Sequence, residues 1–132
     1  MPFLRRLGLA LLLAAAAPFA APSALPPALH AQTLEAHLSD HAMRHILARH
    51  GPGSLAADAG KFAHGTDEAA IRAMILEAIR DGRPRHDTRG RPDTLFDYRF
   101  PAAIGVTADG RPTRRLRVVV APDGDIVTAY PR

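Results

Sequence analysis

The tripeptide Pro122-Asp123-Gly124 constrains the fold of this 132-residue chain most, because it stands between two runs of β-forming residues. Proline presets its own φ, aspartate bonds to nearby backbone and glycine tolerates positive φ, so the tripeptide is a strong turn signal. Residues 115–120 precede the turn and residues 125–131 follow it. The sequence therefore predicts an antiparallel β-hairpin formed by these two runs.

The second of these runs carries two hydroxyl groups on one face. Side chains alternate between the faces of a strand, so Thr128 and Tyr130 are expected to point the same way as Ile126. Two polar groups on a face that otherwise resembles core favour a functional site. The alternative is that Thr128 is an ordinary β-forming residue and Tyr130 an ordinary amphipathic rim residue.

Residues 41–50 have the pattern of an amphipathic helix. Ser39 or Asp40 can cap its N-terminus, and the Gly-Pro-Gly sequence of residues 51–53 must end it. The apolar stripe consists of Met43, Ile46 and Leu47. This stripe is expected to face the core.

The three histidines of this helix lie on different sides of it. His50 falls within the apolar stripe, whereas His41 and His45 fall on the opposite, solvent-facing side. His50 is therefore a candidate general acid or base at the edge of the core. A buried structural histidine, or one that interacts with the helix dipole, is the alternative. His41 and His45 have a spacing found in zinc sites, but no glutamate follows the first histidine as in a His-Glu-x-x-His helix, so no metal is expected.

A second helix is predicted over residues 66–81, with Thr66 as its cap and apolar residues at helical spacing. Further strand-like runs cover residues 94–100 and 103–106. Helices followed by an antiparallel meander predict the α+β class. We expect two N-terminal helices packed on one face of a small, mostly antiparallel sheet of about four strands.

The N-terminal segment has the pattern of a secretory signal peptide. Arg5 and Arg6 precede an unbroken apolar or glycine run over residues 7–17, and an Ala/Pro-rich stretch follows. A run of this length is well short of the roughly 20 residues that span a bilayer, so no permanent membrane anchor is expected. We predict a signal peptide over residues 1–31, with earlier cleavage after Ala20, Ala21 or Ala24 left open. One domain over residues 32–132 would then be secreted or periplasmic.

The chain contains no cysteine. It cannot be a disulfide scaffold or a thiol enzyme. The domain is expected to fold by packing alone, without disulfide, metal or cofactor.

Positive charge is concentrated between the second helix and the strands. This segment contains four candidate phosphate-binding residues, Arg83, Arg85, Arg89 and Arg91. A basic segment rich in glycine and proline suits phosphate, and a solvated linker is the alternative. Lys61, the only lysine of the chain, is a further candidate, with an ordinary solvent-exposed lysine as its alternative.

Taken together, His50, Lys61 eleven residues later and the run Ile126-Val127-Thr128-Ala129-Tyr130-Pro131 resemble known nucleases. The pattern is similar to the small metal-independent ribonuclease domains at the C-termini of bacterial contact-dependent and other polymorphic toxins. One version is the RNase A-like toxin domain, with a His-Val-Gly-type helix end, a basic residue at this spacing and a terminal Thr-Ala-Tyr-Pro strand. The other is the wider group of barnase, EndoU, colicin and RelE-like nucleases.

The resemblance implies a secreted, toxin-type endoribonuclease that needs no metal. It implies His50 as general acid or base, Lys61 at the cationic position, and Thr128 and Tyr130 at the hydroxyl positions. RNA is the implied substrate and an immunity protein a candidate partner. Lysine in place of the usual arginine keeps the charge but loses the bidentate fork.

These residue types suit a particular reaction, and this can be argued without the resemblance to a family. RNA carries its own nucleophile in the 2′-hydroxyl, so an enzyme needs a base, a cation for the phosphorane and a hydrogen-bond donor. The expected product is a 2′,3′-cyclic phosphate. Two alternatives stay open, namely a secreted non-catalytic interaction domain and a nuclease-fold relic that binds an anionic ligand without turnover.

Overall fold

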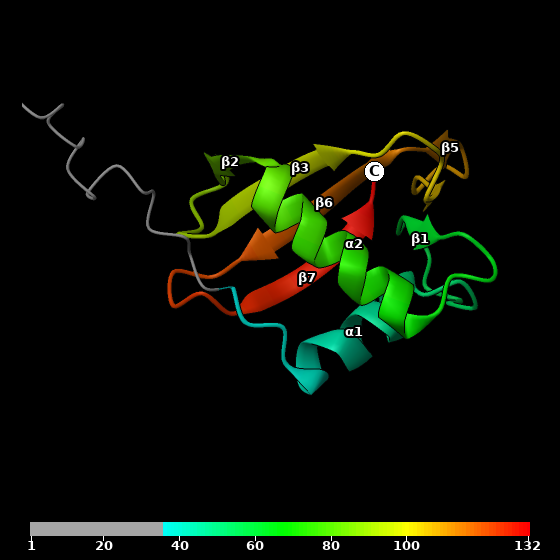
Figure 1. Cartoon of the computed structure of the whole chain (residues 1–132), viewed down its shortest axis with the longest axis horizontal. Helices are drawn as coiled ribbons and strands as arrows, with labels where there is room; N and C mark the ends of the chain where they lie inside the picture. The colour runs from blue at the N-terminus through cyan, green and yellow to red at the C-terminus, as the bar shows by residue number, and fades with distance from the viewer. Residues whose placement is uncertain (1–35) are drawn as a thin grey trace, which may run out of the picture. The chain divides into compact units, whose positions relative to one another are not determined.

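The computed structural model describes residues 36–132, so the predicted signal peptide over residues 1–31 lies outside the described residues. The described residues belong to one compact unit, Leu34–Arg132. Within them, no helix has the length and apolar composition needed to cross a membrane. The α+β class is confirmed, since two helices accompany a four-stranded and a three-stranded antiparallel sheet (Figure 1). The elements in chain order are α1 (Asp40–His50), β1 (Lys61–Phe62), α2 (Glu68–Asp81), β2 (Arg83–His86), β3 (Thr94–Arg99), β4 (Gly105–Val106), β5 (Pro112–Thr113), β6 (Arg115–Val120) and β7 (Ile126–Pro131).

Helix α1 begins and ends as its sequence predicts. The Ser39 hydroxyl accepts a hydrogen bond from the backbone N–H of Ala42 at 3.1 Å, which satisfies one of the free donors of the first turn. At the other end the N–H of Gly51 donates to the Leu47 carbonyl. Of the apolar stripe, Met43 and Ile46 are buried and Leu47 is half-buried; His50 is buried, and His41 and His45 are exposed.

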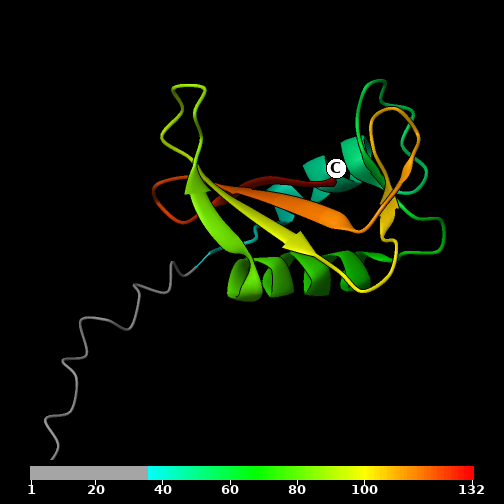
Figure 2. The same ribbon diagram turned by 90° about the horizontal axis from the view of Figure 1, so that it is seen from above.

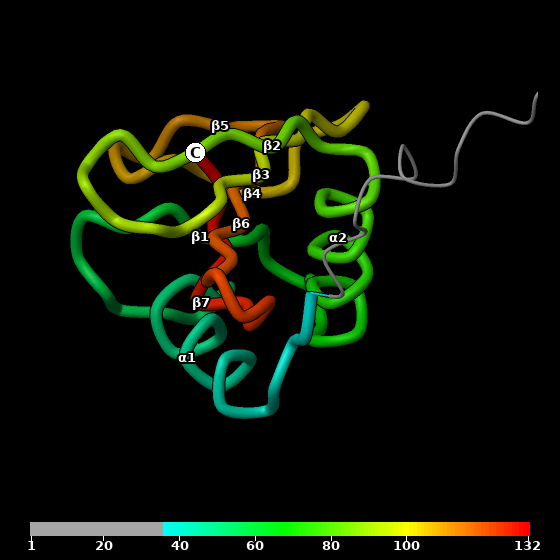
Figure 3. Tube along the Cα trace, turned by 90° about the vertical axis from the view of Figure 1, so that its left-hand side faces the viewer, coloured from blue at the N-terminus to red at the C-terminus, as the bar shows by residue number. Residues whose placement is uncertain are grey.

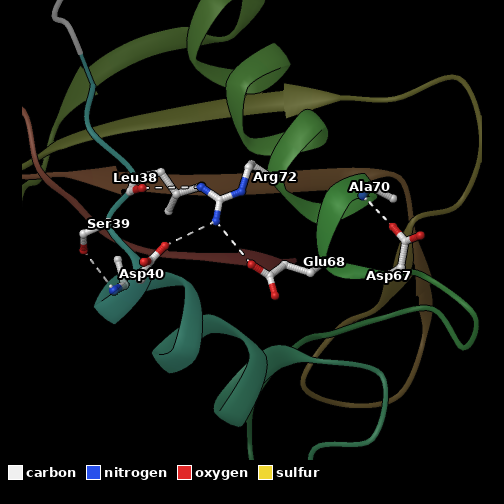
Figure 4. Close-up of polar contacts among 8 residues, drawn as sticks. Leu38, Ser39, Asp40, Asp67, Glu68, Ala70 and Arg72 are labelled. Carbon is white, nitrogen blue, oxygen red and sulfur yellow. Dashed lines mark hydrogen bonds and ion pairs between the residues drawn. The ribbon is translucent and has the colours of Figure 1, made fainter.

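Helix α2 is capped by Asp67, and the prediction of Thr66 as its cap is wrong. The Asp67 carboxylate accepts from the Ala70 N–H at 2.7 Å (Figure 4). The Thr66 N–H instead donates to Ala63 in the preceding turn. An aspartate cap also places a negative charge at the positive end of the helix dipole.

Arg72 of α2 ties this helix to the start of α1. Its guanidinium lies 3.2 Å from Glu68 in its own helix and 3.9 Å from Asp40, and it donates to the Leu38 carbonyl at 3.5 Å (Figure 4). These contacts are mostly exposed, so they orient the two helices more than they stabilise them.

The main sheet has the strand order β2-β3-β6-β7. Its edge strand β2 lies within the basic segment that was expected to be a loop. Pro84 is compatible with this strand because an edge strand can leave a backbone position without a donor. The Pro122-Asp123-Gly124 turn joins β6 to β7 as predicted, with Gly124 at φ 93°.

The second sheet has the order β1-β4-β5. The run 103–106 was expected to belong to the main sheet, but its Gly105–Val106 portion pairs with Lys61–Phe62 instead. A glycine at position 105 permits this pairing, because a Cβ there would lie 2.0 Å from the Lys61 carbonyl oxygen.

The two faces of the main sheet differ in what covers them. Helix α2 contacts β3 and β6 across the apolar face, whereas α1 packs along the edge strand β7, so the two helices do not lie together on one face as predicted (Figures 1 and 3). The apolar core draws on both helices and on the strands, and includes Met43, Ile46, Ile71, Ile75, Phe96, Leu116, Val118, Val120, Ile126 and Ala129. Figure 2 shows α2 along this face, and the β2–β3 loop and the loop after α1 projecting beyond the opposite one.

Candidate active site

A β-bulge determines which way the hydroxyls of β7 point. Val120 pairs with Ile126 but Val119 pairs with Thr128, so Val127 is an extra residue in β7. The bulge shifts the alternation by one position. Thr128 and Tyr130 share a face, as predicted, but the expectation that they point the same way as Ile126 is wrong. They lie on the face that α2 leaves uncovered, and Ala129 joins Ile126 in the core.

The ring of His50 stacks on the ring of Tyr130. Their centroids are 5.2 Å apart and the rings are inclined by 28°. His50 is the last residue of α1, and only 6% of it is exposed. The packing of α1 along β7 therefore brings a buried imidazole onto the phenol of the closing strand.

The hydrogen bond of His50 fixes its tautomer. Its Nδ1 lies 2.8 Å from the carbonyl oxygen of Gly60. A carbonyl oxygen only accepts, so Nδ1 carries the hydrogen and donates it. In the neutral ring Nε2 is then left with a free lone pair, which is the arrangement that a general base requires.

Burial changes the acidity of both stacked rings. Burial lowers the pKa of His50 below its ordinary value of 6.5; the Gly60 hydrogen bond opposes the shift, while Arg49, His45 and Lys61 add to it. His50 is thus neutral at neutral pH. Burial also raises the pKa of Tyr130, with Arg89 opposing that shift, so the phenol keeps its hydrogen and can donate it.

The two rings open onto a hollow of about 700 Å³. Its wall includes three arginines, Arg49, Arg89 and Arg132, and two carboxylates, Asp58 and Asp109. Arg89 comes from the β2–β3 loop, opposite the end of α1. The hollow at the end of β7 therefore has a small excess of positive charge, which favours an anionic ligand.

Thr128 lines the same hollow, and its hydroxyl is unusual. Its Oγ1 is buried and has no hydrogen-bond partner among residues 36–132. Leaving a buried hydroxyl without a partner costs about 1–3 kcal/mol. Such a group in a candidate site is most simply explained by a partner that the ligand supplies.

The structure brings together only part of the predicted site. His50, Thr128, Tyr130 and Arg89 line one hollow. Lys61 does not line it, and its Nζ donates to the Ala56 carbonyl at 2.8 Å.

The four arginines predicted to bind phosphate do not form one group. Arg83 and Arg85 line a separate hollow of about 500 Å³, where Arg85 pairs with Asp97 at 2.8 Å. Arg91 is exposed in the β2–β3 loop and lines neither hollow.

His45 is closer to the site than its position on the helix suggested. It is exposed, but its ring centroid is 6.5 Å from that of His50 and it lines the same hollow. The prediction that His45 faces solvent is confirmed, and His45 still lines the site because the hollow extends around the end of α1. Arg49 and Arg132 were also missed. Adjacency to His50 was a signal for Arg49, and no sequence signal pointed to Arg132.

Metal-ligating side chains do not converge in the described part of the chain. No group of three or more His, Cys, Asp or Glu residues is placed to hold an ion within residues 36–132. His41 and His45 thus have no third ligand there.

Comparison of the chain with protein-family models, with curated proteins and with solved structures finds no match.

Proposed function

We propose that the protein is a metal-independent endoribonuclease that cleaves RNA through its own 2′-hydroxyl. The observation that carries the proposal is the pairing of His50 with Gly60. It leaves a neutral imidazole with a free Nε2 beside a neutral phenol, in a hollow whose wall carries three arginines and two carboxylates. A base, a hydrogen-bond donor and cations are what in-line attack on a phosphodiester requires.

In the proposed reaction Nε2 of His50 removes the proton of the 2′-hydroxyl, and the resulting oxyanion attacks the adjacent phosphorus. The bond from phosphorus to the 5′-oxygen breaks, which leaves a 2′,3′-cyclic phosphate on one fragment. The departing 5′-oxygen takes up a proton and becomes a hydroxyl. His45 is our candidate donor of that proton, because it is the second imidazole on the wall and imidazoles act as general acids as well as bases.

The hydroxyls of β7 stabilise the non-bridging oxygens in this scheme. Tyr130 donates from a phenol that burial keeps protonated. Thr128 lines the hollow and its hydroxyl has no partner among residues 36–132, so it is our candidate for a second donor to a phosphate oxygen. Removing one such donor from an oxyanion site typically costs about 10²-fold to 10³-fold in rate.

Cations balance the charge that builds on the phosphorane. Arg49 and Arg89 supply guanidinium groups from the wall of the hollow. Lys61, which the resemblance assigns to the cationic position, adds positive charge near His50 and lowers the pKa of that ring. The arginines give the site the bidentate donors that lysine lacks.

The proposal is tested with three substrates of one mixed sequence, in the presence of a chelator. The purified protein should cleave single-stranded RNA and leave the 2′-O-methyl RNA and the DNA intact, because only the first carries the nucleophile. The RNA fragments should end in 2′,3′-cyclic phosphate and 5′-hydroxyl groups. Cleavage of DNA, or fragments that carry 5′-phosphates, would refute the mechanism, and no cleavage of RNA would favour an interaction domain.

A further inference from the structure

Four arginines gather at the end of the main sheet, three of them outside the site described above and the fourth, Arg132, in its wall. Arg99, Arg114, Arg115 and Arg132, here called the arginine cluster, line a hollow of about 530 Å³. The remaining wall residues are Ala103, Pro112 and Thr113. No aspartate or glutamate lines this hollow, so all of its charged side chains are positive.

The fold brings these four cations together, and among residues 36–132 only Arg132 has an ion-pair partner, Asp97 at 3.7 Å. Arg99 and Arg115 are directly opposite each other in the β3–β6 register, and both are exposed. Like charges at directly opposed positions destabilise a sheet. Among residues 36–132, none of Arg99, Arg114 and Arg115 forms an ion pair. A charge arrangement that disfavours the free protein is suited to binding an anion.

Asp97, the carboxylate next to the arginine cluster, is already paired with two other arginines. Asp97 accepts two hydrogen bonds from Arg117, at 2.7 and 2.8 Å, and also pairs with Arg85 at 2.8 Å. It lies 3.7 Å from Arg132. Asp97 therefore offsets only part of the charge of the arginine cluster, through Arg132 and the nearby Arg115.

Arg132 connects the arginine cluster with the His50 hollow, because it lines both. Its backbone is fixed on both sides. Its N–H donates to the Arg115 carbonyl at 3.0 Å, and its carbonyl accepts from the Thr113 hydroxyl at 2.6 Å. A ligand that fills the His50 hollow and continues past Arg132 thus reaches Arg99 and Arg115.

We propose that the arginine cluster binds phosphodiester groups of a single-stranded polynucleotide whose reacting phosphate lies at His50. Guanidinium forks match phosphate oxygens bidentately. An open cationic groove with few aromatic side chains follows a backbone without reading its bases. This inference rests on the proposed ribonuclease function only for the identity of the polymer as RNA. The binding itself is independent of cleavage.

The test measures binding of uncleavable 2′-O-methyl RNA to the full chain. Two lengths are compared, a dinucleotide and an oligonucleotide of about ten residues, with wild-type protein and with the double variant Arg99→Ala/Arg115→Ala. The matched control is Arg44→Ala/Arg80→Ala, which removes the same charge from exposed positions on α1 and α2. Thermal unfolding shows whether each variant is folded.

The Arg99→Ala/Arg115→Ala protein should bind the longer oligonucleotide at least about tenfold more weakly. Its slope of log affinity against log salt should fall by about 1 to 1.5, since two phosphate contacts are lost. Its affinity for the dinucleotide, and the affinities of the control variant, should change less than about twofold.

Three results would overturn the inference: unchanged affinity for the longer oligonucleotide, an equal loss in the control variant, or poly-glutamate binding as tight as RNA with the same dependence on Arg99 and Arg115. Absence of RNA cleavage together with the expected binding losses would remove the proposed catalysis and leave the arginine cluster standing.

Discussion

Gly60 and Pro131 approach each other so closely that a Cβ atom on Gly60 would lie 1.8 Å from the Pro131 carbonyl oxygen. The carbonyl of the same glycine accepts the hydrogen of His50 Nδ1. The contact therefore couples the end of β7 to the orientation of the candidate base. Only a residue without a side chain permits it.

Substituting Gly60→Ala should lower both stability and cleavage. The added methyl group has no room, so we expect a loss of about 1–3 kcal/mol in the free energy of unfolding, as for other overpacked sites. Cleavage should fall further than stability explains, because the Gly60 carbonyl moves away from His50. Urea denaturation and kcat/KM measure the two effects. Gly53→Ala is the control, since nothing lies within 4 Å of a Cβ there, and a similar loss in that variant would contradict the account.

Substituting Thr128→Val should lower the rate of RNA cleavage without lowering the free energy of unfolding. The buried hydroxyl has no partner among residues 36–132, and valine has nearly the same shape, so the free energy of unfolding should rise by about 1 kcal/mol or stay the same. RNA cleavage should fall about 10²-fold if the hydroxyl serves the phosphorane. Full activity in a stabilised variant would show that Thr128 is only a structural residue.

The pH dependence of stability should reveal the buried imidazole. The pKa of His50 is lowered in the folded protein, so between that value and 6.5 the unfolded chain binds more protons. Stability then rises with pH across this window and is lost as pH falls through it. The change in free energy of unfolding between about pH 5 and about pH 7.5 should be larger in the wild type than in His50→Asn. Equal changes in the two proteins would contradict the lowered pKa.

The lowered pKa of His50 should also determine the acid limb of the pH–rate profile. A general base must be unprotonated, so kcat/KM should decline only when pH falls below the ordinary histidine value of 6.5. An acid limb above that value would indicate a different base.

We expect the ion pairs of Asp97 to stabilise the folded protein. Its carboxylate pairs with Arg85 and with Arg117, whose side chain is 12% exposed. Asp97→Asn removes the negative charge and one of the two acceptor oxygens that these guanidiniums share, and should cost about 2 kcal/mol in the free energy of unfolding. Asp81→Asn is the matched control, because its pair with Arg80 is exposed and should matter much less. Equal effects of the two substitutions would contradict this role.

The sequence predicted the parts of the fold that local patterns encode. Periodicity and turn chemistry are local, so they identified three features: the apolar stripe of α1, the hairpin turn at Pro122-Asp123-Gly124 and the strand over residues 115–120. Strand β2 was missed, since Arg83-Pro84-Arg85-His86 has no apolar alternation and its pairing depends on Asp97 across the sheet.

The site was only partly predictable for the same reason. Thr128 and Tyr130 share a face by simple alternation, but the bulge at Val127 determines which face, and a bulge leaves no mark in this sequence. His45 and Arg132 enter the site through the packing of α1 against β7. Lys61 was predicted as the only lysine of the chain and from its spacing to His50 in the resemblance, but its side chain donates to the Ala56 carbonyl.

The most direct test of the proposed base is kcat/KM for metal-free RNA cleavage by His50→Asn, compared with His41→Asn. The asparagine amide can still donate to Gly60 but provides no Nε2 lone pair, so His50→Asn should lose at least about 10²-fold while staying folded. His41 is an exposed residue of the same helix, and its substitution should leave kcat/KM within about twofold of wild type. Wild-type activity in folded His50→Asn, or an equal loss in both variants, would contradict the assignment of His50 as the base.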